Sequence, residues 1–178
     1  MSMPTDPAEP RGPLGRYLAA DHARLDALLA RAAAIPGEVD RPAYDAFRAG
    51  LLRHIALEEK ILFPAAVEAR GGQPLPDQRR LRVDHGAIAS LLVPSPTPEL
   101  IRELHSILEP HDRLEEGQGH DAGVYAQCDA LLADRAEELV ARMDAYPPVR
   151  VAAHYDGPRA VRTAAEALRI SALQAARR

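Results

Sequence analysis

The segment LLRHIALEEKILFP, residues 51–64, carries a histidine and a glutamate one helical turn apart on an apolar face. Side chains at positions i and i+4 of a helix lie one above the other, so His54 and Glu58 point the same way. Both continue the apolar stripe that begins at Phe47 and Leu51, and such a stripe faces the core. Because a buried glutamate is costly unless a cation neutralises it, the segment predicts a helix with metal ligands on its buried side.

Three further segments repeat this pattern, with histidine or glutamate in phase with leucine and isoleucine. They are AADHARLDALL (residues 19–29) around His22, RVDHGAIASLL (residues 82–92) around His85, and EPHDRLEEG (residues 109–117) around His111 and Glu115. A single His-x-x-x-Glu pair is typical of a solvated helix face, but two pairs and two lone histidines on four successive helices indicate a metal site inside a bundle. The candidate metal ligands are therefore His22, His54, Glu58, His85, His111 and Glu115.

The composition favours one all-α domain. Of the 178 residues 47% are hydrophobic, which is enough for one sizeable core, and the abundant alanine, leucine, arginine and glutamate are helix formers. A net charge of −4 lacks the basic excess of nucleic-acid-binding proteins, so no nucleic-acid partner is expected. The single cysteine, Cys128, excludes an internal disulfide and a thiolate metal cluster.

The sequence predicts neither a secretory leader nor a membrane segment. The first residues, MSMPTDPAEPRGP, contain prolines and acids where a signal peptide needs a basic end and an apolar run. No apolar stretch approaches the roughly 18 residues that a membrane span needs. We therefore expect a cytoplasmic protein that has no membrane partner.

Proline and glycine divide the chain into predicted helices. These cover residues 13–35, 40–70, 77–93, 97–116, 124–145 and 158–175. Asp40 is the expected N-cap of the second helix, and Pro98 takes the first helical position of the fourth. Pro64 predicts a kink or an early end within the second helix. The domain organisation expected is a disordered, proline-rich lead (residues 1–12), a metal-binding bundle (13–145), and a connector with a final helix (146–178).

The final predicted helix has an apolar stripe of its own. The stripe consists of Val161, Ala165, Leu168 and Ala172, with arginines elsewhere on the helix. The expected role of this stripe is packing against the bundle. The alternative is a surface through which two copies of the chain form a homo-oligomer.

The four segments around the candidate ligands resemble the hemerythrin-like family, the HHE cation-binding domains, and the resemblance covers residues 14–145. It implies an all-α, up-down four-helix bundle with additional C-terminal helices and a non-haem di-iron centre. In proteins of this kind two carboxylates bridge the irons and histidines complete the coordination. By residue, His22 and His54 would bind one iron, His85 and His111 the other, and Glu58 and Glu115 would bridge the two.

The chain also departs from the oxygen carriers that resemble this family. Their third helix usually carries His-x-x-x-His, whereas Leu81 and Ala89 stand four residues from His85 here. Their fourth helix has aspartate where this chain has Glu116. A glycine-rich segment, GQGHDAG, also interrupts the run that leads to Tyr125. These departures argue against simple reversible oxygen carriage.

Four other ionisable residues lie near the candidate ligands in the sequence but are expected on the surface. His105 and Glu109 form a third His-x-x-x-Glu pair, but they follow the stripe of Ile101 and are expected on the surface. Glu59 and Glu116 lie about 100° around their helices from the bridging positions. They are expected as surface carboxylates, with hydrogen bonds to the ligands as the alternative.

The loop residues His120 and Asp121 lie at the rim of the expected site. They form either a plain exposed loop or a lid that supplies a ligand in place of the missing third-helix histidine. Cys128 is expected as a small core or surface residue, and no role is assigned to His154.

Three functions remain open from the sequence. The first is a non-enzymatic module that binds or senses two iron ions, dioxygen, nitric oxide or a related small oxidant. The second is a di-iron enzyme that reduces peroxide or oxidises a small substrate, for which no catalytic residue is assigned. The third is a bundle that holds zinc or another divalent metal structurally, because histidine and carboxylate ligands suit several metals.

Overall fold

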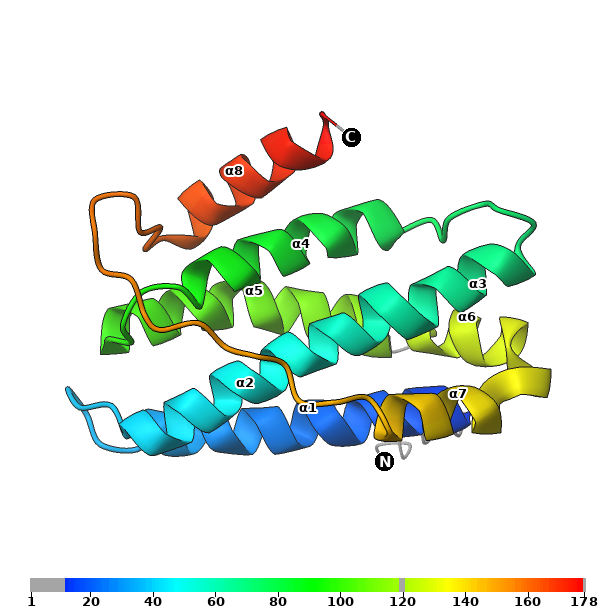
Figure 1. Cartoon of the computed structure of the whole chain (residues 1–178), viewed down its shortest axis with the longest axis horizontal. Coiled ribbons are helices and arrows are strands. Elements are labelled where there is room, and N and C mark those ends of the chain that lie inside the picture. The colour runs from blue at the N-terminus through cyan, green and yellow to red at the C-terminus, as the bar shows by residue number, and fades with distance from the viewer. Residues whose placement is uncertain (1–11, 119–120, 178) are drawn as a thin grey trace, which may run out of the picture.

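The computed structural model describes residues 12–118 and 121–177, and these form the all-α bundle that the sequence predicts. Its four rods are α1 (Pro13–Ala32), α2 with its continuation α3, α4 (Gln78–Leu91) and α5 (Pro98–Glu116), shown in Figure 1. Within the described ranges, extended pairing is limited to an isolated bridge between Gln118 and Asp121.

The second rod is one helix interrupted by a π-helical turn. It comprises α2 (Arg41–Leu57), the π-helix η1 (Glu58–Leu62) and α3 (Phe63–Ala69). The Phe63 N–H bonds to the carbonyl of Glu58, five residues back, and Pro64 has no N–H to continue the ordinary ladder. The helix therefore neither ends nor breaks at Pro64, because the π turn accommodates the proline. The turn begins at Glu58, one of the candidate ligands.

The predicted helix starts in the first part of the chain are confirmed. The Asp40 carboxylate accepts a hydrogen bond from the Ala43 N–H at 3.0 Å and caps α2. The Thr97 hydroxyl accepts one from Leu100 N–H at 3.1 Å, and Pro98 follows it as the first residue of α5. The first helix ends earlier than residue 35, because the chain has already turned when it reaches Pro36.

The prediction of a single helix over residues 124–145 is wrong. The chain forms α6 (Gly123–Leu131), the 3₁₀-helix η2 (Ala133–Arg135) and α7 (Ala136–Asp144) instead. Leu132, with φ −118° and ψ 19°, leaves the helical conformation and is buried. No glycine or proline marks this break. It turns α7 back along α1, so burial of leucine against the bundle overrides local helix propensity.

The last helix, α8 (Ala164–Ala175), begins later than predicted. The Thr163 hydroxyl accepts a hydrogen bond from the Glu166 N–H at 3.4 Å. Thr163 and Glu166 have the threonine-x-x-glutamate spacing of a capping box, which is the signal in the sequence for this start.

Helix α8 packs on α4, as expected of a helix that covers the bundle (Figure 1). The approach is close at Gly86, where an added Cβ would lie 2.3 Å from Ser171 Oγ. The predicted stripe is wrong in part, because Ala165 and Ala172 are exposed. The buried face is Ala164, Ala167 and Ser171, and Val161 and Leu168 pack partly against the core. Self-association through this helix stays a prediction.

The core consists of two apolar clusters at opposite ends of the bundle. One includes Leu29, Phe47 and Leu104, and the other includes Leu14 and Phe63. On α1, on the second rod and on α4, the candidate ligands lie between the members of one cluster and those of the other, so they form a polar layer between the two clusters. The fold therefore places the histidines and glutamates in the middle of the bundle, away from both ends.

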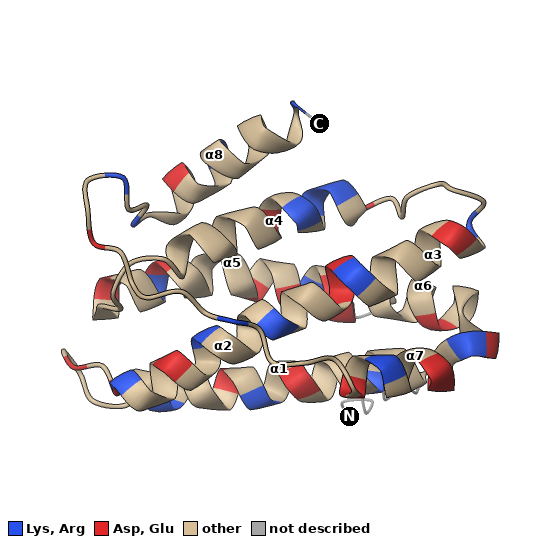
Figure 2. Ribbon diagram, in the orientation of Figure 1, with Lys and Arg blue, Asp and Glu red and all other residues tan. Residues whose placement is uncertain are grey.

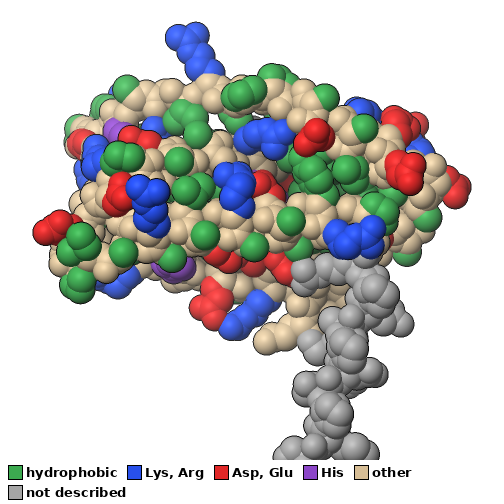
Figure 3. Space-filling view, turned by 90° about the horizontal axis from the view of Figure 1, so that it is seen from below, with side chains coloured by type: hydrophobic (Ala, Val, Ile, Leu, Met, Phe, Trp, Pro, Cys, Tyr) green, Lys and Arg blue, Asp and Glu red, His purple; other side chains and the backbone are tan. Residues whose placement is uncertain are grey.

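Surface charges of both signs are mixed along the helices (Figures 2 and 3). The net charge is −4. Among the helices that the structure describes, none combines the length and apolar character needed to cross a lipid bilayer.

Candidate metal centre

The six predicted ligands meet inside the bundle. Each of the four rods contributes one histidine, and the two glutamates come from the start of η1 and the last turn of α5. Their exposed fractions are His22 6%, His54 1%, Glu58 0%, His85 4%, His111 4% and Glu115 0%. A group of six ionisable side chains this deeply buried requires mutual compensation or a bound cation.

One half of the centre is built on α1 and α2. The ring centroids of His22 and His54 are 4.5 Å apart, so these two histidines lie at one height in the bundle. Nε2 of His22 is 3.4 Å from Glu115 Oε2. Nε2 of His54 is 3.7 Å from Glu58 Oε1.

The other half is built on α4 and α5. The ring centroids of His85 and His111 are 4.9 Å apart, so these two histidines also lie at one height in the bundle. Nε2 of His85 is 3.2 Å from Glu58 Oε2, and Nε2 of His111 is 3.2 Å from Glu115 Oε1. Each glutamate thus extends one carboxylate oxygen toward each histidine pair.

Three buried polar atoms of this centre have no hydrogen-bond partner. They are Glu58 Oε2, His85 Nε2 and Glu115 Oε1. The first two are 3.2 Å apart but lack hydrogen-bonding geometry, and the last two, 3.7 Å apart, are too distant for a hydrogen bond. Unpaired polar atoms are rare in protein interiors and need an explanation. A cation between them satisfies all three, so the residues present fit a metal ion.

The donor atoms converge in two groups. The first comprises Glu58, His85, His111 and Glu115, and the second comprises His22, His54 and Glu115. Glu115 belongs to both groups, and Glu58 lies within reach of both histidine pairs. The arrangement can hold two cations that share carboxylates.

Each histidine also has a carboxylate at its other ring nitrogen, Nδ1. The distances are 2.7 Å from His22 to Glu116, 3.0 Å from His54 to Asp21, 2.9 Å from His85 to Glu59, and 3.4 Å from His111 to Asp84. An Nδ1–H that donates to a carboxylate fixes the ring and directs the Nε2 lone pair toward the centre. All four rings are therefore oriented for metal binding through Nε2.

These supporting carboxylates were predicted only in part. Glu59 and Glu116 are not free surface groups, because their side chains are 24% and 22% exposed and contact the candidate ligands His85 and His22. Asp21 and Asp84 received no role in the sequence analysis. Each directly precedes a ligand histidine but supports the histidine of the adjacent helix. An Asp-His dipeptide on the buried side of a helix is the signal that could have revealed them.

The carboxylates hold protons on the histidines of the metal-free centre. Burial alone would lower the pKa of His22, but hydrogen bonds to Glu115 and Glu116 raise it to about 11. Burial alone would also lower the pKa of His111, but the charge of Glu115 and a hydrogen bond to Asp84 raise it to about 9. Burial would raise the pKa of Glu115, but the surrounding histidines lower it well below its usual range.

Cation binding at pH 7 is therefore expected to release protons. His22 and His111, with pKa values of about 11 and about 9, are protonated at pH 7, and a nitrogen that binds metal cannot keep its proton. Raising the pH toward 9 reduces the proton competition at His111, while His22 still has to lose its proton, so the affinity should increase with pH in this window. Anaerobic calorimetric titration with Fe²⁺ in two buffers of different ionisation enthalpy measures the released protons. Equal apparent enthalpies in both buffers would contradict the expectation.

Replacing Asp21 by asparagine is expected to weaken cation binding about 10–100-fold, the usual effect of losing a partner that orients a ligand. The carboxylate of Asp21 contacts Nδ1 of His54 at 3.0 Å, and an amide there cannot stabilise the same ring polarisation. Equilibrium metal competition measures the dissociation constant. Asp26→Asn, at an exposed position on the same helix, is the matched control, and equal affinities of the two variants would contradict the role of Asp21.

The remaining predicted residues have other positions. His105 and Glu109 are exposed, as expected, and Glu109 pairs with Arg113. His120 lies outside the described residues, so the lid stays a prediction. The neighbouring Asp121 carboxylate accepts a hydrogen bond from the Gly123 N–H at 3.2 Å.

Two residues without a metal role contribute to the structure. His154 contacts the Pro94 carbonyl through Nδ1 at 2.9 Å and Asp45 through Nε2 at 3.2 Å, so it fastens the connector before α8 to the bundle. Cys128 is fully buried, and burial raises the pKa of its thiol to about 12. The thiol therefore stays protonated, as a structural cysteine does.

The sequence alone predicts no function for Tyr125, yet this residue reaches the centre. Its side chain is buried at the start of α6, and the hydroxyl donates a hydrogen bond to Glu58 Oε1 at 2.7 Å. Burial and the nearby charges of Glu115 and Glu58 raise the pKa of Tyr125 well above its usual value. In the metal-free protein the hydroxyl therefore keeps its proton.

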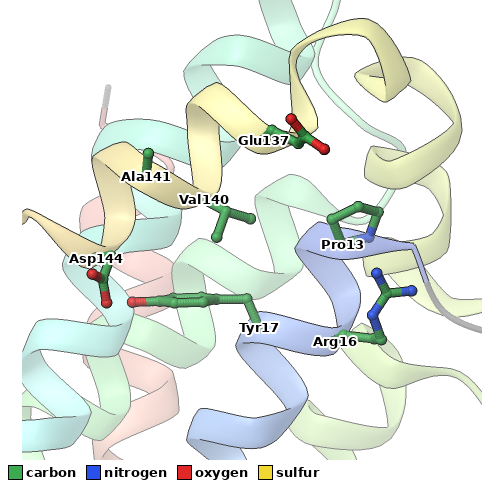
Figure 4. Close-up of a pocket in the computed structure, with 7 residues that line it drawn as sticks. All are labelled: Pro13, Arg16, Tyr17, Glu137, Val140, Ala141 and Asp144. Atoms are coloured by element: carbon green, nitrogen blue, oxygen red, sulfur yellow. The ribbon is translucent and has the colours of Figure 1, made fainter.

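A shallow surface hollow lies elsewhere, between α1 and α7 (Figure 4). Pro13, Tyr17 and Val140 contribute apolar lining, and the Tyr17 hydroxyl is directed toward Asp144. None of the six candidate ligands lines this hollow. The hollow is therefore separate from the candidate metal centre.

Comparison with known proteins agrees with this geometry. Residues 15–118, more than half of the chain, match the family model described as the hemerythrin HHE cation binding domain. Comparisons with curated proteins and with solved structures give no match. The matched range contains all six buried donors of the centre. The chain belongs to the hemerythrin HHE cation-binding domain family.

Proposed function

We propose that this protein is a non-haem di-iron protein that binds or senses a small oxidant, such as dioxygen or nitric oxide, at its buried centre. The observation that supports this most directly is the shared position of the two glutamates. Glu58 lies 3.7 Å from His54 and 3.2 Å from His85, through different oxygens of one carboxylate. Glu115 spans the two pairs in the same way, between His22 and His111. Two carboxylates in such positions suit a pair of cations better than a single ion.

The donor set favours iron over a structural zinc ion. Imidazole and carboxylate ligands with open positions are typical of non-haem iron. Structural zinc sites are usually closed and tetrahedral, and many contain cysteine thiolates. The only cysteine here, Cys128, is no member of either donor group. Bound iron would supply reversible one-electron chemistry, while the chain orients the histidines and keeps water from the centre.

Burial supports a small ligand. The most exposed of the six donors, His22, is 6% exposed. A diatomic molecule or peroxide can reach such a site through small fluctuations of the packing, whereas a larger substrate would require the bundle to open. The protein would therefore act on a small oxidant and not on a bulky organic substrate.

Metal analysis combined with optical spectroscopy tests the proposal. The full chain, expressed with iron and purified natively, is expected to contain about two irons and to change its spectrum reversibly between air and dithionite. Nitric oxide added to the reduced protein is expected to alter the spectrum in a stoichiometric manner. Zinc in place of iron, with no redox response, would support the structural alternative. Sustained consumption of hydrogen peroxide, lost in Glu58→Ala, would support the enzyme.

A further inference from the structure

The two halves of the centre differ in whether their donor atoms have a polar neighbour that belongs to neither a histidine nor a glutamate. The half formed by His85 and His111 contains the three unpaired atoms, Glu58 Oε2, His85 Nε2 and Glu115 Oε1. In the half formed by His22 and His54, the corresponding atoms surround the hydroxyl of Tyr125. The difference originates in α6, the helix that follows the glycine-rich segment and carries Tyr125 into the bundle.

The Tyr125 oxygen has more polar neighbours than one hydroxyl group can satisfy. It lies 2.7 Å from Glu58 Oε1, 3.0 Å from Glu115 Oε2, and 3.2 Å from Nε2 of both His22 and His54. A tyrosine hydroxyl has one hydrogen to donate, and the shortest contact, to Glu58, takes it. Protons on the histidines can complete the arrangement in the metal-free protein. A cation that replaces those protons would be surrounded by all five donor atoms.

We propose that Tyr125 is a ligand of the cation held by His22 and His54, which makes the two metal positions unequal. This inference rests on the proposed di-iron function. The first position has five protein donors: two imidazole nitrogens, one oxygen from each glutamate, and the phenol oxygen. The second has the two imidazoles of His85 and His111 with the remaining glutamate oxygens. On binding Fe³⁺, the phenol O–H bond breaks, an iron–oxygen bond forms, and the proton leaves to solvent.

The sequence of α4 supports open coordination sites at the second cation, the one between His85 and His111. Leu81 and Ala89, one helical turn on either side of His85, offer no donor atom. The His85–His111 cation therefore keeps sites that a small molecule can occupy. Tyr125 completes the coordination of the His22–His54 cation. An oxidant is therefore expected to bind at the His85–His111 cation.

Optical and resonance Raman spectroscopy of the ferric protein test this ligand. The full chain is loaded with Fe²⁺ without air and oxidised with ferricyanide. A phenolate bound to Fe³⁺ is expected to give a visible charge-transfer band and enhanced tyrosine ring modes. Tyr125→Phe is expected to lose both while it keeps its iron. Tyr44→Phe is the matched control, because Tyr44 is equally buried, lies in the other apolar cluster, and has a hydroxyl without a hydrogen-bond partner.

The outcomes separate this inference from the proposed function. Ring modes that shift when the wild-type protein contains ring-deuterated tyrosine support the ligand, even if Tyr125→Phe does not fold. Two irons without enhanced tyrosine modes overturn the inference and leave the di-iron function in place. A spectrum that Tyr44→Phe loses and Tyr125→Phe keeps also overturns it. A chain that takes up no iron overturns both proposals.

Discussion

Replacing Glu115 by glutamine is expected to remove cation binding from both halves of the centre. The carboxylate of Glu115 is fully buried and lies 3.4 Å from His22 through one oxygen and 3.2 Å from His111 through the other. Glutamine preserves the shape but offers one neutral oxygen and an amide that cannot bind metal. The loss should exceed the about 10–100-fold that accompanies removal of a supporting hydrogen bond. Metal content after dialysis and the dissociation constant measure the effect.

The same helix supplies the control for this experiment. Glu109 follows His105 at the same four-residue spacing as Glu115 follows His111, but its side chain is 65% exposed. Glu109→Gln should therefore bind metal as the wild-type protein does. If Glu115→Gln retained both cations at wild-type affinity, the shared carboxylate would not be a ligand and the two-cation centre would be wrong.

The contrast between these two pairs shows what the sequence reveals about the site. The spacing of His105 and Glu109 is the same as that of His111 and Glu115, and only the phase against Leu104 and Leu108 separates them. Phase along one helix is a local property, so it predicts which side chains face the core. The positions of all six donors and the bundle itself follow from it, together with the family resemblance.

Side-chain contacts between different helices are harder to predict from the sequence. Asp21 supports His54 and Asp84 supports His111, and each pair joins neighbouring rods whose relative height and rotation must be known. Tyr125 reaches the centre from α6, a separate helix that follows the glycine-rich segment. These contacts depend on tertiary packing, so local periodicity cannot predict them.

The same limit explains the errors in the last third of the chain. The break at Leu132 has no local signal, because its cause is the burial of Leu132 against the bundle. The start of α8 has a local signal in Thr163 and Glu166, but the proline at residue 158 suggested an earlier one. A helix boundary is thus predictable where a cap sets it and unpredictable where packing sets it.

Removing the cations with a chelator is expected to lower the melting temperature of the protein. The unfolded chain has no preformed site, so a cation at about 100 times its dissociation constant stabilises the folded state by about 2.7 kcal/mol. For a chain of this size each kcal/mol changes Tm by about 2–4 °C, so the expected decrease is about 5–10 °C. Calorimetric or circular dichroism melting of the iron-loaded protein, before and after chelation, measures it.

The Glu115→Gln variant links this stability to the centre. Because Glu115 belongs to both donor groups, a chelator should leave the Tm of this variant unchanged. Acidification should also reduce the effect in the wild-type protein, since protons compete with cations for His22 and His111, whose pKa values are about 11 and about 9. A chelator effect of equal size in the variant and the wild type would mean that the stabilising cation binds elsewhere on the chain.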